Sequence, residues 1–276
     1  ASDVYKRQNY YVLTPQSGDT LSFTCAFTSG EPAGGKSSFE TVLASATRYW
    51  NNFWSRGGVI DFSHCKDPRA KELERRVVLS QYLMAIQCAG SVPPQESGLT
   101  YNTWFGKFHL EMHWWHAVHF ALWGRPELLE KSLAWYKDSA YVNACAIAER
   151  QGFKGARWMK MTDPSAVEAP SKVGSFLIWQ QPHFIYMAEL LYRANPSREV
   201  LDKYKDLVAA TAEFMYSFAT YDELEGRFVL KGAIPAQETL RAADTVNPPF
   251  ELSYWHYAIS VAQKWRERLG LERNLQ

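Results

Sequence analysis

The segment KFHLEMHWWHAVHFALWGR, from Lys107 to Arg125, concentrates side chains that could bind a metal ion or a polar ligand. It holds His109, His113, His116, His119, Glu111, Trp114, Trp115 and Trp123. His109 and His113 are four residues apart, as two zinc ligands on one helix would be, but the zinc-peptidase pattern needs its glutamate directly after the first histidine. Glu111 comes one residue later, so we predict no metal site and no cofactor. An aromatic core accounts for His116 and His119, whereas a ligand could reach His109 and Glu111 from a neighbouring long loop.

A second candidate lies in the segment GRFVLKGAIPAQETLRAADTVNPPFE, residues 226–251, where Glu238 follows Pro235 among small residues. An acid in a loop is usually only hydrated. Glycoside hydrolysis, however, needs a carboxylic acid that protonates the leaving oxygen and a base that activates water. Glu238 becomes a candidate for this chemistry if the fold brings it close to Glu111 and Asp163.

The segment SFLIWQQPHFIYMAELLYR, residues 175–193, places polar groups in a sequence that is otherwise apolar. Trp179, Gln180, Gln181 and His183 come early in this predicted helix. Amide and imidazole groups could bind sugar hydroxyls, and an ordinary buried polar cluster explains the same pattern.

The elements that must position these residues are mainly helical. Apolar residues at helical spacing, with capping residues and glycine stops, predict helices over 37–55, 67–89, 108–123, 126–151, 173–194, 197–219 and 249–269. Ser37 and Glu40 form a capping-box pattern at the first of these. Residues 9–29 alternate with a period of two at Leu21, Phe23, Cys25 and Phe27, which predicts one or two strands before a glycine-rich linker.

Short and long connections alternate between the later helices. The short ones are GRP and NPS, and the long ones cover 90–107, 152–172 and 220–248. In antiparallel hairpins this alternation places the long loops at one end, and long loops in compact domains are usually functional. We therefore expect a polar-ligand site there, drawn from Trp104, Lys107, Arg157, Trp158, Asp163, Glu168, Glu238, Arg241, Asp244 and Asn247.

The composition narrows the function classes. Thirty basic and 29 acidic residues give no electrostatic reason to expect nucleic acid or an anionic membrane as partner. No apolar run is long enough to span a bilayer, and the four separated cysteines indicate no zinc ribbon. The aromatic content of 15%, with 11 tryptophans, suits either sugar binding or a thick helical core. Residues 1–8 have no structural pattern and resemble a translated library adaptor, so they are excluded from the fold prediction.

From about Ala33 onward, four segments in order resemble the six-hairpin (α/α)6 glycosidases, nearest to glycoside hydrolase families 65 and 95. GKFHLEMHWW is similar to N-I-N-L-E-M-N-Y-W of family 95, and GFKGARW is similar to G-Y-K-G-A-x-F-P-W of family 65. WQQPH falls near the family 65 segment K-Q-A-D. IPAQE falls where these families have S-P-E or G-P-D-E, whose glutamate is the general acid.

The resemblance implies a mainly α fold, an incomplete (α/α)6 toroid of helical hairpins over 36–276. Residues 9–35 would form the end of a β-sandwich domain and a linker. It makes Glu238 the general acid of an inverting glycosidase that cleaves an α-linked sugar in an oligo- or polysaccharide. The expected substrate-binding residues are Glu111, His109, Lys107, Trp104, Trp158, Asp163, Gln181, His183 and Asn247.

Two departures from the families leave alternatives open. Family 95 orients the attacking water with two asparagines, and Lys107 and His109 stand at the matching positions. The resemblance places the catalytic base in the carboxy-terminal portion of the family, which we expect beyond Gln276. A glycoside phosphorylase, a lyase or epimerase, and a carbohydrate-binding protein without turnover remain alternatives. The sequence does not give the compartment, although the analogy favours a periplasmic or extracellular one.

Overall fold

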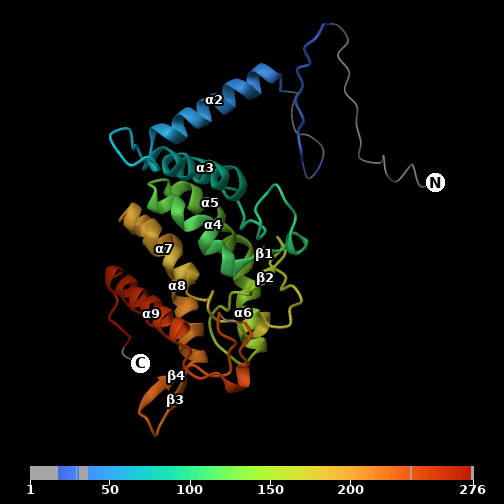
Figure 1. Cartoon of the computed structure of the whole chain (residues 1–276). Helices are drawn as coiled ribbons and strands as arrows, with labels where there is room; N and C mark the ends of the chain where they lie inside the picture. Colours follow the sequence, from blue (N-terminus) through green and yellow to red (C-terminus); the bar gives the residue numbers. More distant parts are fainter. Residues whose placement is uncertain (1–17, 29, 31–36, 237, 275–276) are drawn as a thin grey trace, which may run out of the picture. The chain divides into compact units, whose positions relative to one another are not determined.

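The computed structural model describes residues 18–28, 30, 37–236 and 238–274 (Figure 1). The chain divides into two compact units, residues 1–56 and 57–276. The helix that the sequence places at the start of the helical domain therefore falls in the first unit. Residues 1–8 and most of the linker lie outside the described residues.

The first unit contains α2, Phe39–Ser55. Its N-cap is Ser38, whose hydroxyl accepts from the Thr41 N–H at 3.2 Å, so the predicted cap at Ser37 is wrong by one residue. Residues 18–28 form no strand, although they cover much of the predicted strand segment. Their alternating apolar side chains are exposed, with Phe27 at 94%, so within the described residues no sheet partner buries this face.

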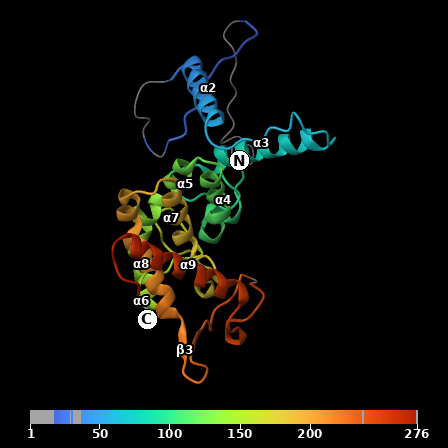
Figure 2. The ribbon, with the colours of Figure 1, turned by 90° about the vertical axis from the view of Figure 1, so that its left-hand side faces the viewer.

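The second unit consists of packed helices with two short antiparallel strand pairs. Its helices are α3 (Ala70–Cys88), α4 (Leu110–Leu122), α5 (Pro126–Trp135), α6 (Tyr141–Arg150), α7 (His183–Ala194), α8 (Arg198–Phe218) and α9 (Pro249–Arg268). A π-helical turn, Tyr136–Ala140, joins α5 to α6, so the predicted helix 126–151 is nearly continuous. Figures 1 and 2 show α4, α7, α8 and α9 side by side, and α7 packs against α4, α5, α8 and α9.

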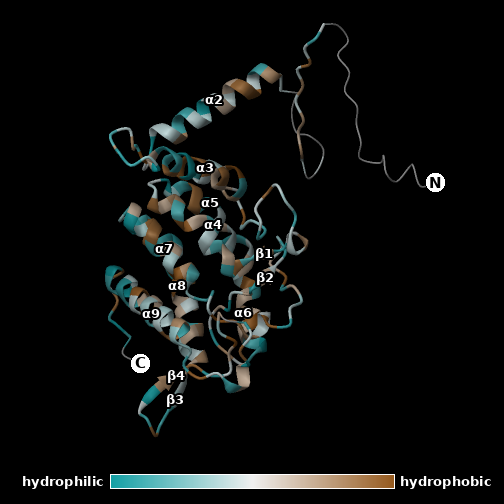
Figure 3. Ribbon diagram, viewed as in Figure 1, coloured by the Kyte–Doolittle hydropathy of each residue, from teal (hydrophilic) through white to brown (hydrophobic). Residues whose placement is uncertain are grey.

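Helix α8 illustrates why these segments fold as predicted. Ser197 caps it by accepting from the Val200 N–H at 3.3 Å, and acidic Glu199 lies in the first turn, where the helix dipole favours it. Its buried residues recur at three- and four-residue spacing, and the resulting alternation of hydrophobic and hydrophilic positions can be followed in Figure 3. The largest side chains of the core include Trp158, Tyr136 and Phe184.

The predicted helix over 173–194 is wrong in its first half. Residues Gly174–Phe176 form one 3-10 turn, and α7 begins only at His183. Pro182 precedes it, and the side chains of Gln180 and Gln181 bind backbone groups instead of facing outward from a helix. This irregular segment forms part of the site described below.

Strands β1 (Phe108–His109) and β2 (Met161–Thr162) pair antiparallel, with Phe108 opposite Thr162. This pairing holds the first two long loops together at the start of α4. Strands β3 (Thr220–Asp222) and β4 (Arg227–Val229) form a separate hairpin. None of the described helices is both long and apolar enough to cross a bilayer. The described residues do not include a closed ring of hairpins.

Candidate active site

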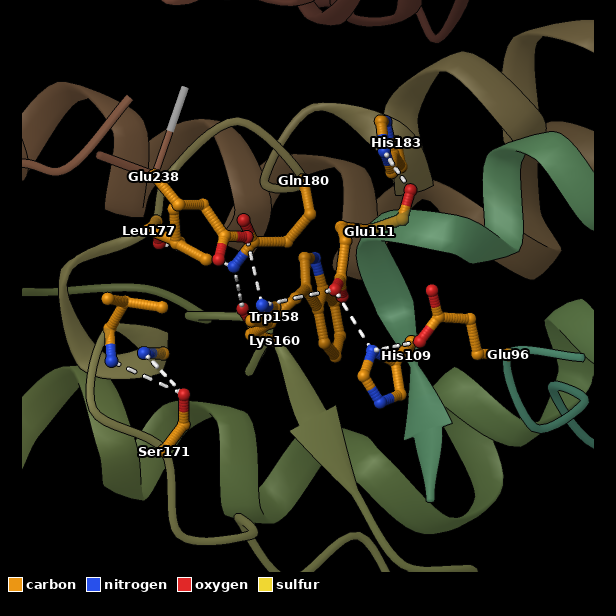
Figure 4. A network of polar contacts seen from close by, with 12 residues as sticks. Glu96, His109, Glu111, Trp158, Lys160, Ser171, Leu177, Gln180, His183 and Glu238 are labelled. Atoms are coloured by element: carbon orange, nitrogen blue, oxygen red, sulfur yellow. Dashed lines mark hydrogen bonds and ion pairs between the residues drawn. The ribbon is translucent and has the colours of Figure 1, made fainter. Parts of the chain in front are cut away.

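A row of ionisable side chains crosses the loops at the start of α4. Figure 4 shows it as Glu96, His109, Glu111, Lys160 and Glu238, joined one to the next. These five residues come from three long loops and from the β1–α4 junction, although they are up to 142 positions apart in the sequence. The structure therefore brings the acid of the late loop to the acid at the start of α4.

The centre of the row is buried, and its Glu238 end is accessible to solvent. The side chains of His109 and Glu111 are 4% and 5% exposed, Lys160 is 12% exposed and Glu238 is 38% exposed. Lys160 Nζ lies 2.9 Å from Glu238 Oε1 and 3.6 Å from Glu111 Oε1. The two carboxylate oxygens are therefore no more than 6.5 Å apart, the sum of these two distances. One ammonium group thus lies between two carboxylates, of which one is buried and one is partly exposed.

His109 is held between two carboxylates through one ring nitrogen. Its Nδ1 lies 3.1 Å from Glu111 Oε1 and 3.4 Å from Glu96 Oε2, so the hydrogen of the neutral ring is best placed on Nδ1. Its Nε2 and the Oε2 atom of Glu111 are buried and have no hydrogen-bond partner within the described residues. Both atoms can accept from a hydroxyl group, which is the chemistry that binds a sugar.

Local backbone contacts fix the position of Glu111. The Leu110 N–H donates to the Lys160 carbonyl at 2.8 Å, which ties the first turn of α4 to the residue that directly precedes β2. His183 Nε2 lies 3.1 Å from the Glu111 carbonyl, and its Nδ1 lies 2.8 Å from the Tyr254 hydroxyl. Burial lowers the pKa of His183 from 6.5 to about 3, although its hydrogen bond to the Glu111 carbonyl opposes this shift. A neutral His183 is therefore a support for Glu111.

Two of the predicted site residues, Trp158 and Gln181, are buried in the core of the protein. Trp158 is 1% exposed, donates from Nε1 to the Thr211 hydroxyl at 3.0 Å and packs against Tyr136 and Phe184. Gln181 accepts from the Trp158 N–H and donates to the Ala156 carbonyl. A buried indole has no free face on which a sugar could stack, so the structure makes these residues part of the framework.

Four more predicted residues lie at the edge of the row or outside it. The Trp104 ring is 59% exposed with its centroid 6.0 Å from that of His109, and Lys107 Nζ lies 5.6 Å from the centre of the Phe105 ring. Asp163 accepts from the Val167 N–H within its own turn, at 2.9 Å. Asn247, at φ 50°, accepts from the Leu230 N–H at 2.9 Å and shapes the loop. Only Trp104 among them offers an open aromatic face next to the row.

The sequence prediction missed Glu96 and Lys160 as members of the site. No motif marks either one, and both reach the row because β1 pairs with β2 and Gln95 forms a bridge with Phe108. Gln180 is considered together with Gln181 in the sequence analysis but is not among the expected substrate-binding residues. Gln180 has a buried Oε1 atom without a partner within the described residues. Among all the residues that the structure describes, no group of three acidic, histidine or cysteine side chains is arranged to hold a metal ion.

Comparisons with known proteins support the fold. No protein-family profile matches the chain, and no curated protein matches it. A solved structure described as "Putative kojibiose phosphorylase from human microbiome" is similar, with a TM-score of 0.67 and 14% identity over 85% of this chain. The match spans 34% of that protein, so the chain corresponds to about a third of its length. At this identity the match shows a shared fold, which is mainly helical in this chain.

Proposed function

We propose that the protein cleaves a glycosidic bond, with Glu238 as the general acid. The observation that carries this proposal is the meeting of Glu238 and buried Glu111 on either side of Lys160, within 6.5 Å of one another. The fold, shared with a protein described as a sugar phosphorylase, supports the same reading. Two carboxyl groups at this separation can contact one sugar unit and the bond that leaves it.

In this mechanism Glu111 and His109 bind hydroxyl groups of the sugar at the cleaved bond. Glu238 gives its proton to the glycosidic oxygen while the bond from the anomeric carbon to that oxygen breaks. An oxygen from water forms the new bond on the opposite face, which inverts the anomeric centre, and the water proton passes to a base. The proposal assigns no residue as the base.

The comparison favours a second candidate, phosphorolysis, because the similar solved structure is described as a phosphorylase. Inorganic phosphate would then replace water and give a sugar 1-phosphate, while Glu238 keeps the same role. A panel of α-linked disaccharides, incubated with and without phosphate, separates the two activities through the products that chromatography detects. Proton NMR of the fresh product shows whether the anomeric centre has inverted.

The variant Glu238→Gln tests the acid itself. We expect it to fold and to lose at least about 100-fold in turnover, the lower range for a missing general acid. Glu225→Gln is the matched control, since Glu225 is an exposed glutamate, 61% accessible, in the β3–β4 hairpin. Equal product release by wild type and Glu238→Gln would remove Glu238 from the mechanism. Retention of a glycan without any release by the wild type would favour a carbohydrate-binding protein.

A further inference from the structure

The acid loop is anchored just before Glu238, but the Glu238 side chain depends on one contact. The Ile234 N–H donates to the Phe176 carbonyl at 2.9 Å, and the Ala236 N–H donates to the buried carboxylate of Glu251. Residues 238–240 are exposed. Within the described residues, the contact with Lys160 is the single hydrogen bond or ion pair of the Glu238 side chain.

Lys160, in contrast, is fixed from several directions. It follows fully buried Met159 and precedes β2, and its carbonyl accepts from the Leu110 N–H. Its side chain is 12% exposed, so few other rotamers are open to it, and its ammonium lies between the two carboxylates. Figure 4 shows Lys160 between Glu238 and Glu111.

We propose that Lys160 is a positioning residue, which holds the carboxyl group of Glu238 opposite Glu111. The inference rests on the proposed function, since it assigns Lys160 a part in delivering the proton of Glu238. An ammonium on a residue that is held next to β2 is suited to this, because it can attract the carboxylate of an exposed loop from one defined point. In the reaction Lys160 keeps its place, while Glu238, which is 38% exposed, takes up a proton from water, turns to the glycosidic oxygen and passes the proton to it.

The proposal predicts a loss in the chemical step, with little change in binding. Lys160→Met keeps the length and apolar stem of the side chain and removes the charge. A misplaced catalytic group costs on the order of 100-fold, so we expect kcat for an oligosaccharide to fall by about 10- to 100-fold while KM changes less than about threefold. Lys160→Arg keeps the cation and should recover part of the loss.

A substrate that needs no acid gives the decisive comparison. The glycosyl fluoride of the sugar that the wild type releases has a leaving group that departs without a full proton transfer. Lys160→Met and Glu238→Gln should both act on this fluoride at close to the wild-type rate, if the defect is in delivery of the proton. Lys203→Met is the matched control, because Lys203 forms an equally close ion pair, 2.7 Å from Glu130, on α8. It should leave both substrates unaffected.

Amide hydrogen exchange gives a readout that does not depend on turnover. We expect Lys160→Met to speed exchange in residues 238–246, whereas Lys203→Met should not. Wild-type kcat for the oligosaccharide in Lys160→Met, or an equal loss on the fluoride, would overturn the positioning role. If the wild type cleaves no glycan, the proposed function fails, and unchanged exchange in Lys160→Met would then reject the contact itself.

Discussion

Acid should destabilise this fold through two fully buried histidines. His113 is 0% exposed, with Nδ1 3.1 Å from the Tyr136 hydroxyl and Nε2 2.8 Å from the Ser132 hydroxyl. Burial lowers its pKa from 6.5 to about 3, with His116 and His183 as smaller causes. Burial has the same effect on His183, whose pKa also falls to about 3. Both rings are therefore neutral in the folded protein at pH values where the unfolded chain binds protons.

The sign and size of the effect follow from this difference. Because the pKa is lower in the folded state, stability is complete above pH 6.5 and is lost as pH falls toward about 3. Each histidine lowers the free energy of unfolding by about 1 kcal/mol between pH 6.5 and 5.5, and by about 1.4 kcal/mol for each further pH unit. The pair should therefore lower the free energy of unfolding by about 2 kcal/mol over the first unit.

Urea unfolding, followed by circular dichroism at a series of pH values, measures this slope. His113→Gln removes one titrating group and should lower the slope by about 1 kcal/mol over the first unit, whatever its effect on stability at neutral pH. Ser132→Ala is the matched control, because it removes a hydrogen-bond partner of His113 and leaves the ring in place. An equal slope in the two variants would refute the assignment of the acid sensitivity to His113.

Three further predictions concern the framework of the site. Gly155→Ala should destabilise the protein by about 3 kcal/mol or more in urea unfolding, because Gly155 has φ +74° and an added Cβ would collide with the backbone of α8. The control is Gly152→Ala. Gly152 has φ +81° but open space around it, so this change should destabilise the protein by only about 1–2 kcal/mol. Burial raises the pKa of Glu251 above 4.5, so the wild-type protein loses stability as pH rises above that value. Glu251→Gln has no such titration, and its amide oxygen can still accept from the Ala236 N–H, so the variant should gain stability relative to wild type as pH rises. A difference in stability that stays constant with pH would contradict this. Glu189→Ala should lower both the free energy of unfolding, by about 2–4 kcal/mol, and Tm. Glu189 is 2% exposed, and its carboxylate accepts hydrogen bonds from Arg193, Trp265 and Arg268. A change below about 0.5 kcal/mol in calorimetry would refute its role between α7 and α9.

Local signals explain which parts of the fold the sequence could predict. The N-cap at Ser197 and the apolar spacing that follows predict α8 to within one residue at each end. The start of α7 could not be read in this way, because Gln180 and Gln181 are held by backbone atoms of residues 156–158, more than 20 positions away. The spacing of apolar residues does not reveal such contacts, so the predicted helix begins too early in the sequence.

The residues of the site also differ in whether a local sequence signal marks them. Glu111 and Glu238 could be named because their segments resemble known motifs. Glu111 lies in a helix that directly follows one long loop, and Glu238 lies within another. Glu96 and Lys160 have no such signal, and their place depends on the register of β1 against β2. Trp158 shows the opposite case, since its motif predicted ligand binding and the structure buries its ring beside Tyr136. Burial depends on every neighbour at once, which no single segment encodes.

The buried acceptors next to the row indicate what the site can hold. Glu111 Oε2, His109 Nε2 and Gln180 Oε1 have no partner within the described residues, and each such atom costs about 1–3 kcal/mol if nothing binds it. A hydroxyl-rich ligand satisfies several of them together, because each sugar hydroxyl can donate one hydrogen bond. A sugar that binds here should therefore raise Tm, by an amount that grows with its concentration. Glu111→Gln replaces one acceptor with a donor, so it should weaken this rise without unfolding the protein, and an undiminished rise would place the sugar elsewhere.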